Sequence, residues 1–214
     1  MISVIDDVVS SLNTIKNSPT SIDNIKKLSY LIRKSIVYSE KIWLTGIGKP
    51  GYIAQKQAAT LKSVMVDAQY LDAMLAGHGD LGPVPSDKQS LLIAMSKSGC
   101  SSELYSLFKV LKEIRPNCKI VMICMSNKVQ LQKVKSCKDI DFICHVDVDP
   151  SELDGYGIVP ATSNALFEVI MSMAISNAFD CDELGMVDMC KRLQKCHPSG
   201  TLQNKVTNLL NSLQ

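Results

Sequence analysis

Three features that mark other classes of protein are missing from this sequence. No apolar run approaches the ~20 residues needed to span a bilayer, and residues 1–7 lack the basic-then-apolar order of a signal peptide. The eight cysteines include no CxxC pair, which argues against a zinc ribbon. The 23 basic and 21 acidic residues leave a formal net charge of +2, so no global field favours nucleic acid or a membrane surface. We therefore expect a cytoplasmic protein that binds neither.

The composition is that of an ordinary globular domain. Of the 214 residues, 46% are hydrophobic and 21% are charged, which is enough for a real core. Several cysteines lie inside apolar runs such as 120–124, so we interpret them as buried, reduced thiols. We see no internal repeat and no linker. We expect one domain over 1–214, with helices at 1–38, a core at 40–200 and a C-terminal helix at 201–213.

Apolar runs alternate with helical patterns along the chain. Near-continuous apolar runs indicate strands that are buried on both faces of a parallel sheet. The sequence therefore predicts an α/β fold, a three-layer α-β-α sandwich with a five-stranded parallel sheet. We expect strands at 41–46, 67–71, 90–95, 119–125 and 140–146, and later helices at about 52–64, 101–114, 162–180, 182–195 and 201–213. Ligands bind such sheets at the carboxyl ends of the strands, so the loops there are the candidate site.

A serine-rich loop follows the third expected strand. It reads Ser96-Lys97-Ser98-Gly99-Cys100-Ser101-Ser102-Glu103 and has four hydroxyls just before a helix. Backbone amides at a helix start, together with hydroxyl donors, can hold a phosphate without a strong net charge. Simple N-capping by Ser101 or Ser102, with Glu103 favouring the helix dipole, is the alternative. One cap needs one hydroxyl, so the four hydroxyls favour an anion site.

The loop after the first strand, at 45–51, is rich in glycine. Glycines such as Gly48 let the backbone approach a ligand, and the following helix start favours an anion, to which Lys49 adds a charge. The loop matches neither the dinucleotide fingerprint nor a Walker loop. A strand-to-helix turn with a solvated lysine remains the alternative.

Three other loop residues are candidates for chemistry. His78 lies between two glycines, where a histidine is exposed rather than part of a core. Glu152 lies in the loop at 150–160, and His197 precedes a proline. We assign His145, at the end of a strand, a structural role.

Taken in order, these segments resemble the sugar isomerase (SIS) domain family, and within it the arabinose 5-phosphate isomerases. The family pattern runs Gly-x-Gly-Lys-Ser-Gly, His-Gly-Asp-Leu-Gly, Ser-Asn-Ser-Gly-Glu-Ser/Thr-x-Glu, a glutamate with Pro-Thr-x-Ser, and His-Pro-Gly-Gly. The resemblance spans about residues 40–200, and its specific parts are the His-Gly-Asp-Leu-Gly and final His-Pro blocks. The matching segments here are Gly46-Ile47-Gly48-Lys49-Pro50-Gly51, His78-Gly79-Asp80-Leu81-Gly82, Ser96 to Glu103, Glu152, Pro160-Ala161-Thr162-Ser163 and His197-Pro198-Ser199-Gly200.

The resemblance implies a flavodoxin-like SIS fold and an aldose–ketose isomerase that interconverts D-ribulose 5-phosphate and D-arabinose 5-phosphate. It also implies a homotetramer with active sites at subunit boundaries. In relatives the product feeds synthesis of KDO, an acid sugar of bacterial surface polysaccharides. We expect no redox cofactor and assign no metal ligand. The implied catalytic residues are Lys49, Glu103, Glu152 and His197, and the implied substrate-binding residues are Gly48, His78, Ser96, Ser98, Ser101, Ser102 and Thr162.

The chain departs from the family pattern at several positions. Pro50 replaces a serine, Cys100 a glutamate and Ala161 a threonine. Asp72 stands where relatives carry a histidine linked to metal binding. The lost hydroxyls are expected to weaken contacts to phosphate. We also expect a short member without the tandem regulatory CBS domains of longer relatives.

Isomerisation moves a proton between C1 and C2 through a cis-enediol, which needs a base and stabilisation of the developing oxyanion. We expect Glu152 or Glu103 to carry the proton and Lys49 to stabilise the enediolate. His197 would assist proton transfer to oxygen or ring opening. A sugar-phosphate sensor is the main alternative, but a sensor needs no catalytic pair such as Glu152 and His197. An isomerase of another sugar phosphate, such as a hexulose 6-phosphate, is a third possibility.

Overall fold

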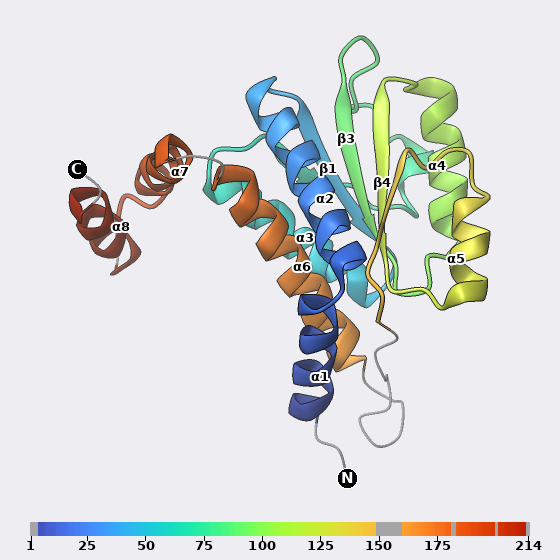
Figure 1. The fold of residues 1–214 in the computed structure, drawn as a ribbon. Coiled ribbons are helices and arrows are strands. Elements are labelled where there is room, and N and C mark those ends of the chain that lie inside the picture. The colour runs from blue at the N-terminus through green and yellow to red at the C-terminus, as the bar shows by residue number, and fades with distance from the viewer. Residues whose placement is uncertain (1–3, 149–159, 181–182, 200, 213–214) are drawn as a thin grey trace.

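The computed structural model describes residues 4–148, 160–180, 183–199 and 201–212. Its centre is a five-stranded sheet in the order β2-β1-β3-β4-β5, and every neighbouring pair of strands is parallel (Figure 1). This is the strand order of flavodoxin-like sheets, so the predicted fold class is confirmed. The strands are β1 (Lys41–Gly46), β2 (Ala68–Tyr70), β3 (Ser90–Met95), β4 (Cys118–Cys124) and β5 (Phe142–His145).

The three central strands form because their apolar runs are buried on both faces. Every residue of β3 is buried, and β1 and β4 are buried at all positions but one. A sheet covered by helices on both sides has no water-facing side, so its strands do not alternate between apolar and polar residues.

Helices cover the two faces of the sheet. On one face α1 (Val4–Lys16), α2 (Pro19–Val37), α3 (Lys49–Ser63) and α6 (Ala161–Phe179) pack with Ile42 and Leu44 of β1 into one core cluster (Figure 1). On the other face α4 (Ser102–Ile114), α5 (Lys128–Lys135) and the segment 71–84 pack around Trp43 and Phe108. Within the described ranges, none of the helices combines the length and the apolar character needed to cross a membrane.

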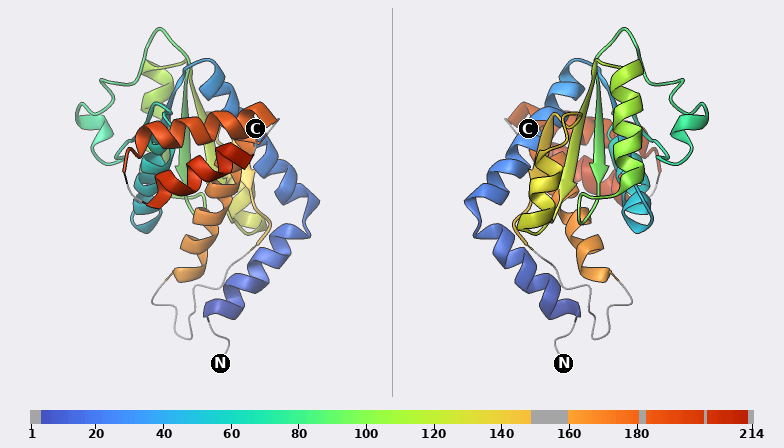
Figure 2. Two further views of the ribbon diagram at one scale, coloured as in Figure 1. Left: turned by 90° about the vertical axis from the view of Figure 1, so that its left-hand side faces the viewer. Right: turned by 90° about the vertical axis from the view of Figure 1, so that its right-hand side faces the viewer.

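The last two helices form a pair beside this sandwich. Figures 1 and 2 show α7 (Glu183–Cys196) and α8 (Thr201–Ser212) side by side, on the side of the molecule away from α4 and α5. Gln194 Nε2 of α7 donates a hydrogen bond to Thr207 Oγ1 of α8 at 3.0 Å.

The sequence missed two short elements, α5 and the 3-10 helix η1 (Ala76–His78). A capping box begins α5: Asn127 Oδ1 accepts from the amide of Gln130 at 3.0 Å, and the amide of Asn127 donates to Gln130 Oε1 at 3.2 Å. The other expected helices and all five strands lie within about three residues of their predicted bounds.

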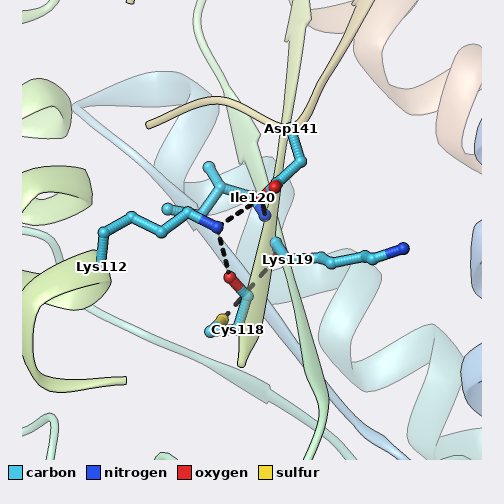
Figure 3. A network of polar contacts seen from close by, with 5 residues as sticks. All are labelled: Lys112, Cys118, Lys119, Ile120 and Asp141. Carbon is cyan, nitrogen blue, oxygen red and sulfur yellow. Dashed lines mark hydrogen bonds and ion pairs between the residues drawn. The ribbon is translucent and has the colours of Figure 1, made fainter. Parts of the chain in front are cut away.

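A polar network joins α4 to the amino end of β4 (Figure 3). Lys112 Nζ donates to the backbone oxygen of Cys118 at 2.9 Å and to Asp141 Oδ2 at 2.6 Å. The same carboxylate oxygen accepts from the amide of Ile120 at 2.7 Å. The network fixes the end of the sheet opposite to the serine-rich loop.

Candidate active site

The serine-rich loop runs from the carboxyl end of β3 to the start of α4, where sequence reasoning placed an anion site. Ser101 is the N-cap residue of α4, but its side chain makes no capping hydrogen bond. Its Oγ instead lies 3.2 Å from Ser96 Oγ. Helix capping by the Ser101 side chain is therefore wrong as an explanation of this loop. The Ser101 hydroxyl is paired instead with the hydroxyl of Ser96.

Hydrogen bonds within the loop hold its shape. The amide of Gly99 donates to Ser96 Oγ, and the amide of Cys100 donates to Ser98 Oγ, each at 3.1 Å. Ser126 Oγ, which follows β4, donates to the backbone oxygen of Ser98 at 2.8 Å. The loop is thus preorganised by its own serines and by the neighbouring strand.

Gly99 is required at its position in the loop. Its φ is +67°, a left-handed conformation that residues with a Cβ rarely adopt. A Cβ added there would lie 2.5 Å from Val134 Cγ2 of α5. The loop therefore packs directly against α5, and only glycine fits between them.

Tyr105 supports the loop from α4. Its hydroxyl donates to the backbone oxygen of Gly99 at 2.8 Å. Burial raises the pKa of Tyr105 to about 12, and the nearby thiols of Cys100, Cys137 and Cys124 add to the effect. The hydroxyl therefore stays protonated and keeps donating to the loop.

A cavity of about 360 Å³ opens at this loop. Three of the four loop serines line it, so it is the natural place for the predicted anion. The wall opposite comes from the 45–51 loop and from the start of α5. The lining residues are Ile47, Pro50, Ser96, Lys97, Ser98, Ser101, Asn127 and Gln130.

Lys49 does not line this serine-loop cavity, but its neighbour Pro50 does. Lys49 is the first residue of α3 and is exposed. Gly48 precedes it with a φ of +65°. The backbone at Gly46 lies very close to the backbone at Gly51: a Cβ added to Gly46 would lie 2.9 Å from the amide nitrogen of Gly51. Ile47 and Pro50 line the same cavity as the loop serines, so the structure brings the first glycine loop and the serine loop together.

Glu103 lines a second cavity, next to the short helix that carries His78. Glu103 and Gly77 both line a hollow of about 280 Å³ between α4 and η1, and His78 is the exposed last residue of η1. Glu103 also accepts a hydrogen bond from Ser102 Oγ at 3.2 Å. Neither Glu103 nor His78 lines the serine-loop cavity, although Glu103 is only two residues from Ser101.

Thr162, predicted to bind substrate, is fully buried at the start of α6. Its Oγ1 donates to Asp7 Oδ2 of α1 at 2.6 Å, so the hydroxyl proton is engaged within the protein. Glu152 lies outside the described residues.

His197 follows α7, and in one chain it lies far from Lys49. Its Nδ1 is 3.0 Å from the backbone oxygen of Leu193. The preceding residue, Cys196, places its Sγ 3.7 Å from the backbone oxygen of Lys62, near the carboxyl end of α3. Lys49 begins the same helix, which puts the two ends about 20 Å apart at 1.5 Å per residue. The structure does not bring these two residues together within one chain.

Lys97, Asn127 and Gln130 line the serine-loop cavity but were not predicted as site residues. An Asn followed three residues later by Gln is a known signal for a helix start, so the α5 capping box could have been found from sequence. Its proximity to the serine loop is a tertiary fact that no local pattern carries.

The described parts of the chain contain no group of three or more His, Cys, Asp and Glu side chains that could hold a metal ion. The ring Nε2 of His145 lies 2.8 Å from the backbone oxygen of Ser126, and its own carbonyl accepts from Asn24 Nδ2. These backbone contacts fit the structural role expected for it.

No family model matches the sequence. A curated relative, arabinose 5-phosphate isomerase KdsD of Francisella tularensis, is 28% identical over 198 residues, covering 92% of this chain and 56% of the relative. The relative of the same name from Yersinia pestis is 37% identical over 123 residues, covering 58% of this chain and 34% of the relative. The chain thus spans about half or less of the length of these two relatives.

Solved structures share the fold. A Bacteroides fragilis protein described as a putative phosphosugar isomerase involved in capsule formation aligns with a TM-score of 0.67 at 24% identity, covering 85% of this chain and 91% of that one. At this identity the likeness shows the fold alone. Together with the curated relatives, it confirms the resemblance that the motifs predict: the chain has the SIS fold and a sequence similar to the arabinose 5-phosphate isomerases.

Proposed function

We propose that the chain is an aldose–ketose isomerase of sugar phosphates. The observation that carries the proposal is the serine loop: three hydroxyls line a cavity at a helix start whose N-cap side chain does not cap it. Helix N-termini favour anions, and a phosphate would accept hydrogen bonds from both hydroxyls and first-turn amides. Similarity to the curated isomerases supports the reaction type.

The finer proposal is interconversion of D-ribulose 5-phosphate and D-arabinose 5-phosphate through a cis-enediol. Ser96, Ser98 and Ser101 bind the phosphate, with Ser102 and Gly48 as further substrate-binding positions. Thr162 is left out of this set, because its buried hydroxyl donates to Asp7. Binding this end of the substrate positions C1 and C2 for proton transfer, which is a common use of remote binding energy. The names of the curated relatives support this substrate pair.

The chemical groups of the proposed reaction are those that the motifs assign outside the cavity lining. Glu152 or Glu103 carries the proton between C1 and C2, because carboxylates act as bases once their surroundings bring the pKa near the working pH. Lys49 stabilises the enediolate. His197 assists proton transfer to oxygen or ring opening, and His78 contacts the substrate.

His197 requires a second copy of the chain in this scheme. Cys196, which precedes His197, contacts the far end of α3, and that end is about 20 Å from the helix start at Lys49. We therefore propose a homotetramer in which sites lie between subunits and His197 comes from a partner copy. The length of α3 supports this arrangement, because one chain alone does not bring His197 and Lys49 to the same site.

The test is incubation of purified protein with D-ribulose 5-phosphate in deuterated water, followed by NMR. Formation of arabinose 5-phosphate labelled at C2 is the expected result. Ser98→Ala should raise KM about tenfold, since it removes a hydrogen bond to a charged group. Ser86→Ala is the matched control, because this exposed serine precedes β3 at the opposite end of the sheet.

Each other outcome would change the proposal in a defined way. Deuterium exchange without arabinose 5-phosphate would keep an isomerase but assign it another sugar phosphate. Clear ligand-induced NMR shifts without deuterium exchange would indicate a sugar-phosphate sensor instead of an isomerase. An unchanged KM in Ser98→Ala would contradict the assignment of the serine loop to phosphate binding.

A further inference from the structure

The lining of the serine-loop cavity has one feature that the serine motif does not explain. Among its described lining residues, Lys97 is the one with a basic side chain, and none is acidic. Lys97 lies between Ser96 and Ser98 and is half-buried. Lys49, the lysine that the motif assigns to the site, is exposed and does not line the cavity.

The backbone of Lys97 is held firmly. Its carbonyl accepts from the amide of Met125 at 2.9 Å, just after β4. On either side, the amide of Ser96 donates to the backbone oxygen of Ile123 at 3.1 Å, and the backbone oxygen of Ser98 accepts from Ser126 Oγ. The loop that carries Lys97 is therefore fixed against β4, so its side chain starts from a defined position in the cavity wall.

The charges around the cavity favour an anion of high charge. The ammonium of Lys97 adds to the partial positive charge at the start of α4, and the three serine hydroxyls add dipoles. Glu103, an acidic residue close in sequence, lines the other cavity and is hydrogen-bonded to Ser102.

We propose that Lys97 binds the phosphate group of the substrate directly and makes this loop selective for a dianionic phosphate ester. The proposal rests on the proposed function only in assigning the serine-loop cavity to phosphate. Lys49 then acts at the reacting end of the sugar, and the two lysines serve opposite ends of one ligand.

The experiment is a titration of the full chain with inorganic phosphate at pH 8, followed by calorimetry at two salt concentrations. Lys97→Gln should weaken phosphate binding about tenfold or more, as expected for loss of a charge-assisted hydrogen bond. The dependence of binding on salt should also become shallower. Lys97→Arg should restore binding in part, since it restores the charge in a different shape.

Two controls remove the same charge elsewhere. Lys128→Gln alters an exposed lysine at the start of α5, one residue from Asn127 but outside the cavity lining. Lys119→Gln alters an exposed lysine at the amino end of β4, at the opposite end of the sheet. Both should bind phosphate within about twofold of the unaltered protein, since neither exposed side chain lines the cavity or can donate to the bound anion from it.

The outcomes separate the two proposals. If Ser98→Ala weakens phosphate binding but Lys97→Gln does not, the Lys97 proposal is overturned and the proposed function stands. Equal weakening by Lys97→Gln and Lys128→Gln would also overturn it, because a general field would then explain the result. If the unaltered protein binds no phosphate, the assignment of the cavity fails, and the Lys97 proposal fails with it.

In catalysis the same variant gives a second readout. Lys97→Gln should raise KM for the sugar phosphate with kcat nearly unchanged, because a contact made equally in the ground and transition states affects binding alone. A fall in kcat at unchanged KM would place Lys97 in the chemical step and contradict its role at the phosphate.

Discussion

Gly99→Ala is the substitution that tests the geometry of the serine loop most directly. Two costs add at this position. A residue with a Cβ in the left-handed conformation costs about 1–2 kcal/mol, and Gly99 has a φ of +67°. The new Cβ would also lie 2.5 Å from Val134 Cγ2, and overpacking of this kind costs about 1–3 kcal/mol. We therefore expect the free energy of unfolding to fall by about 2–5 kcal/mol.

The assay is urea denaturation followed by the fluorescence of Trp43. This is the single tryptophan of the chain, and it is buried in the core cluster that contains Val134. Phosphate binding should weaken in the same variant, because the amide of Gly99 and its carbonyl are tied to Ser96 and Tyr105. A loss of stability below about 0.5 kcal/mol, the range of ordinary surface substitutions, would refute the reasoning.

A double-mutant cycle separates the two costs. Val134→Ala removes the methyl group that the new Cβ would strike but leaves the φ of residue 99 unchanged. The double variant should be less destabilised than the sum of the two single variants, by about 1–3 kcal/mol. If the two effects add within about 0.5 kcal/mol, the contact between the loop and α5 does not exist in solution.

Two further substitutions test contacts away from the cavity lining. Asp141→Ala should lower the free energy of unfolding by about 1–2 kcal/mol in the same urea assay, because the carboxylate accepts from both Lys112 and the amide of Ile120. The exposed Asp87→Ala should change it by less than about 0.5 kcal/mol, and equal effects would contradict the network in Figure 3. For Tyr105 the folded pKa of about 12 lies above the ordinary value of 10.0, so the unfolded chain loses its proton first and stability should fall as pH rises from 10 to 12. Tyr105→Phe should make that decline shallower in urea denaturation at a series of pH values, and an unchanged slope would show that Tyr105 titrates normally.

The sheet could be predicted because its signals are local. The runs at β1, β3 and β4 are apolar at nearly every position, and burial on both faces demands that pattern. By contrast, α5 has one buried residue, Val134, so no apolar stripe marks it as a helix. Its start is specified by hydrogen bonds between Asn127 and Gln130 rather than by burial. Hydrophobic periodicity does not reveal a helix of that kind.

In the candidate site, too, some features could be predicted from local sequence and others depend on tertiary packing. The serine loop could be predicted because its hydroxyls, its glycine and the helix start are contiguous in sequence, and the structure keeps them together at one cavity. Sequence order says nothing about which of Lys49 and Lys97 lines that cavity, since both follow strands and both neighbour glycines or serines. The choice depends on how the 45–51 loop packs against the serine loop, and that packing is tertiary.

The two halves of the proposed reaction therefore differ in what they require. The serine-loop cavity is built from one chain: its lining comes from the loops after β1, β3 and β4, which the sheet itself holds in register. His197 is tied instead to the far end of α3 through Cys196, so the proposed chemistry needs a second chain. Binding of inorganic phosphate is accordingly a test of the fold alone, whereas turnover is a test of the fold and of assembly together. This is why the titration with Lys97→Gln remains decisive for the cavity whatever the oligomeric state of the preparation. It is also why an inactive preparation counts against the isomerase only once its subunits are shown to be associated.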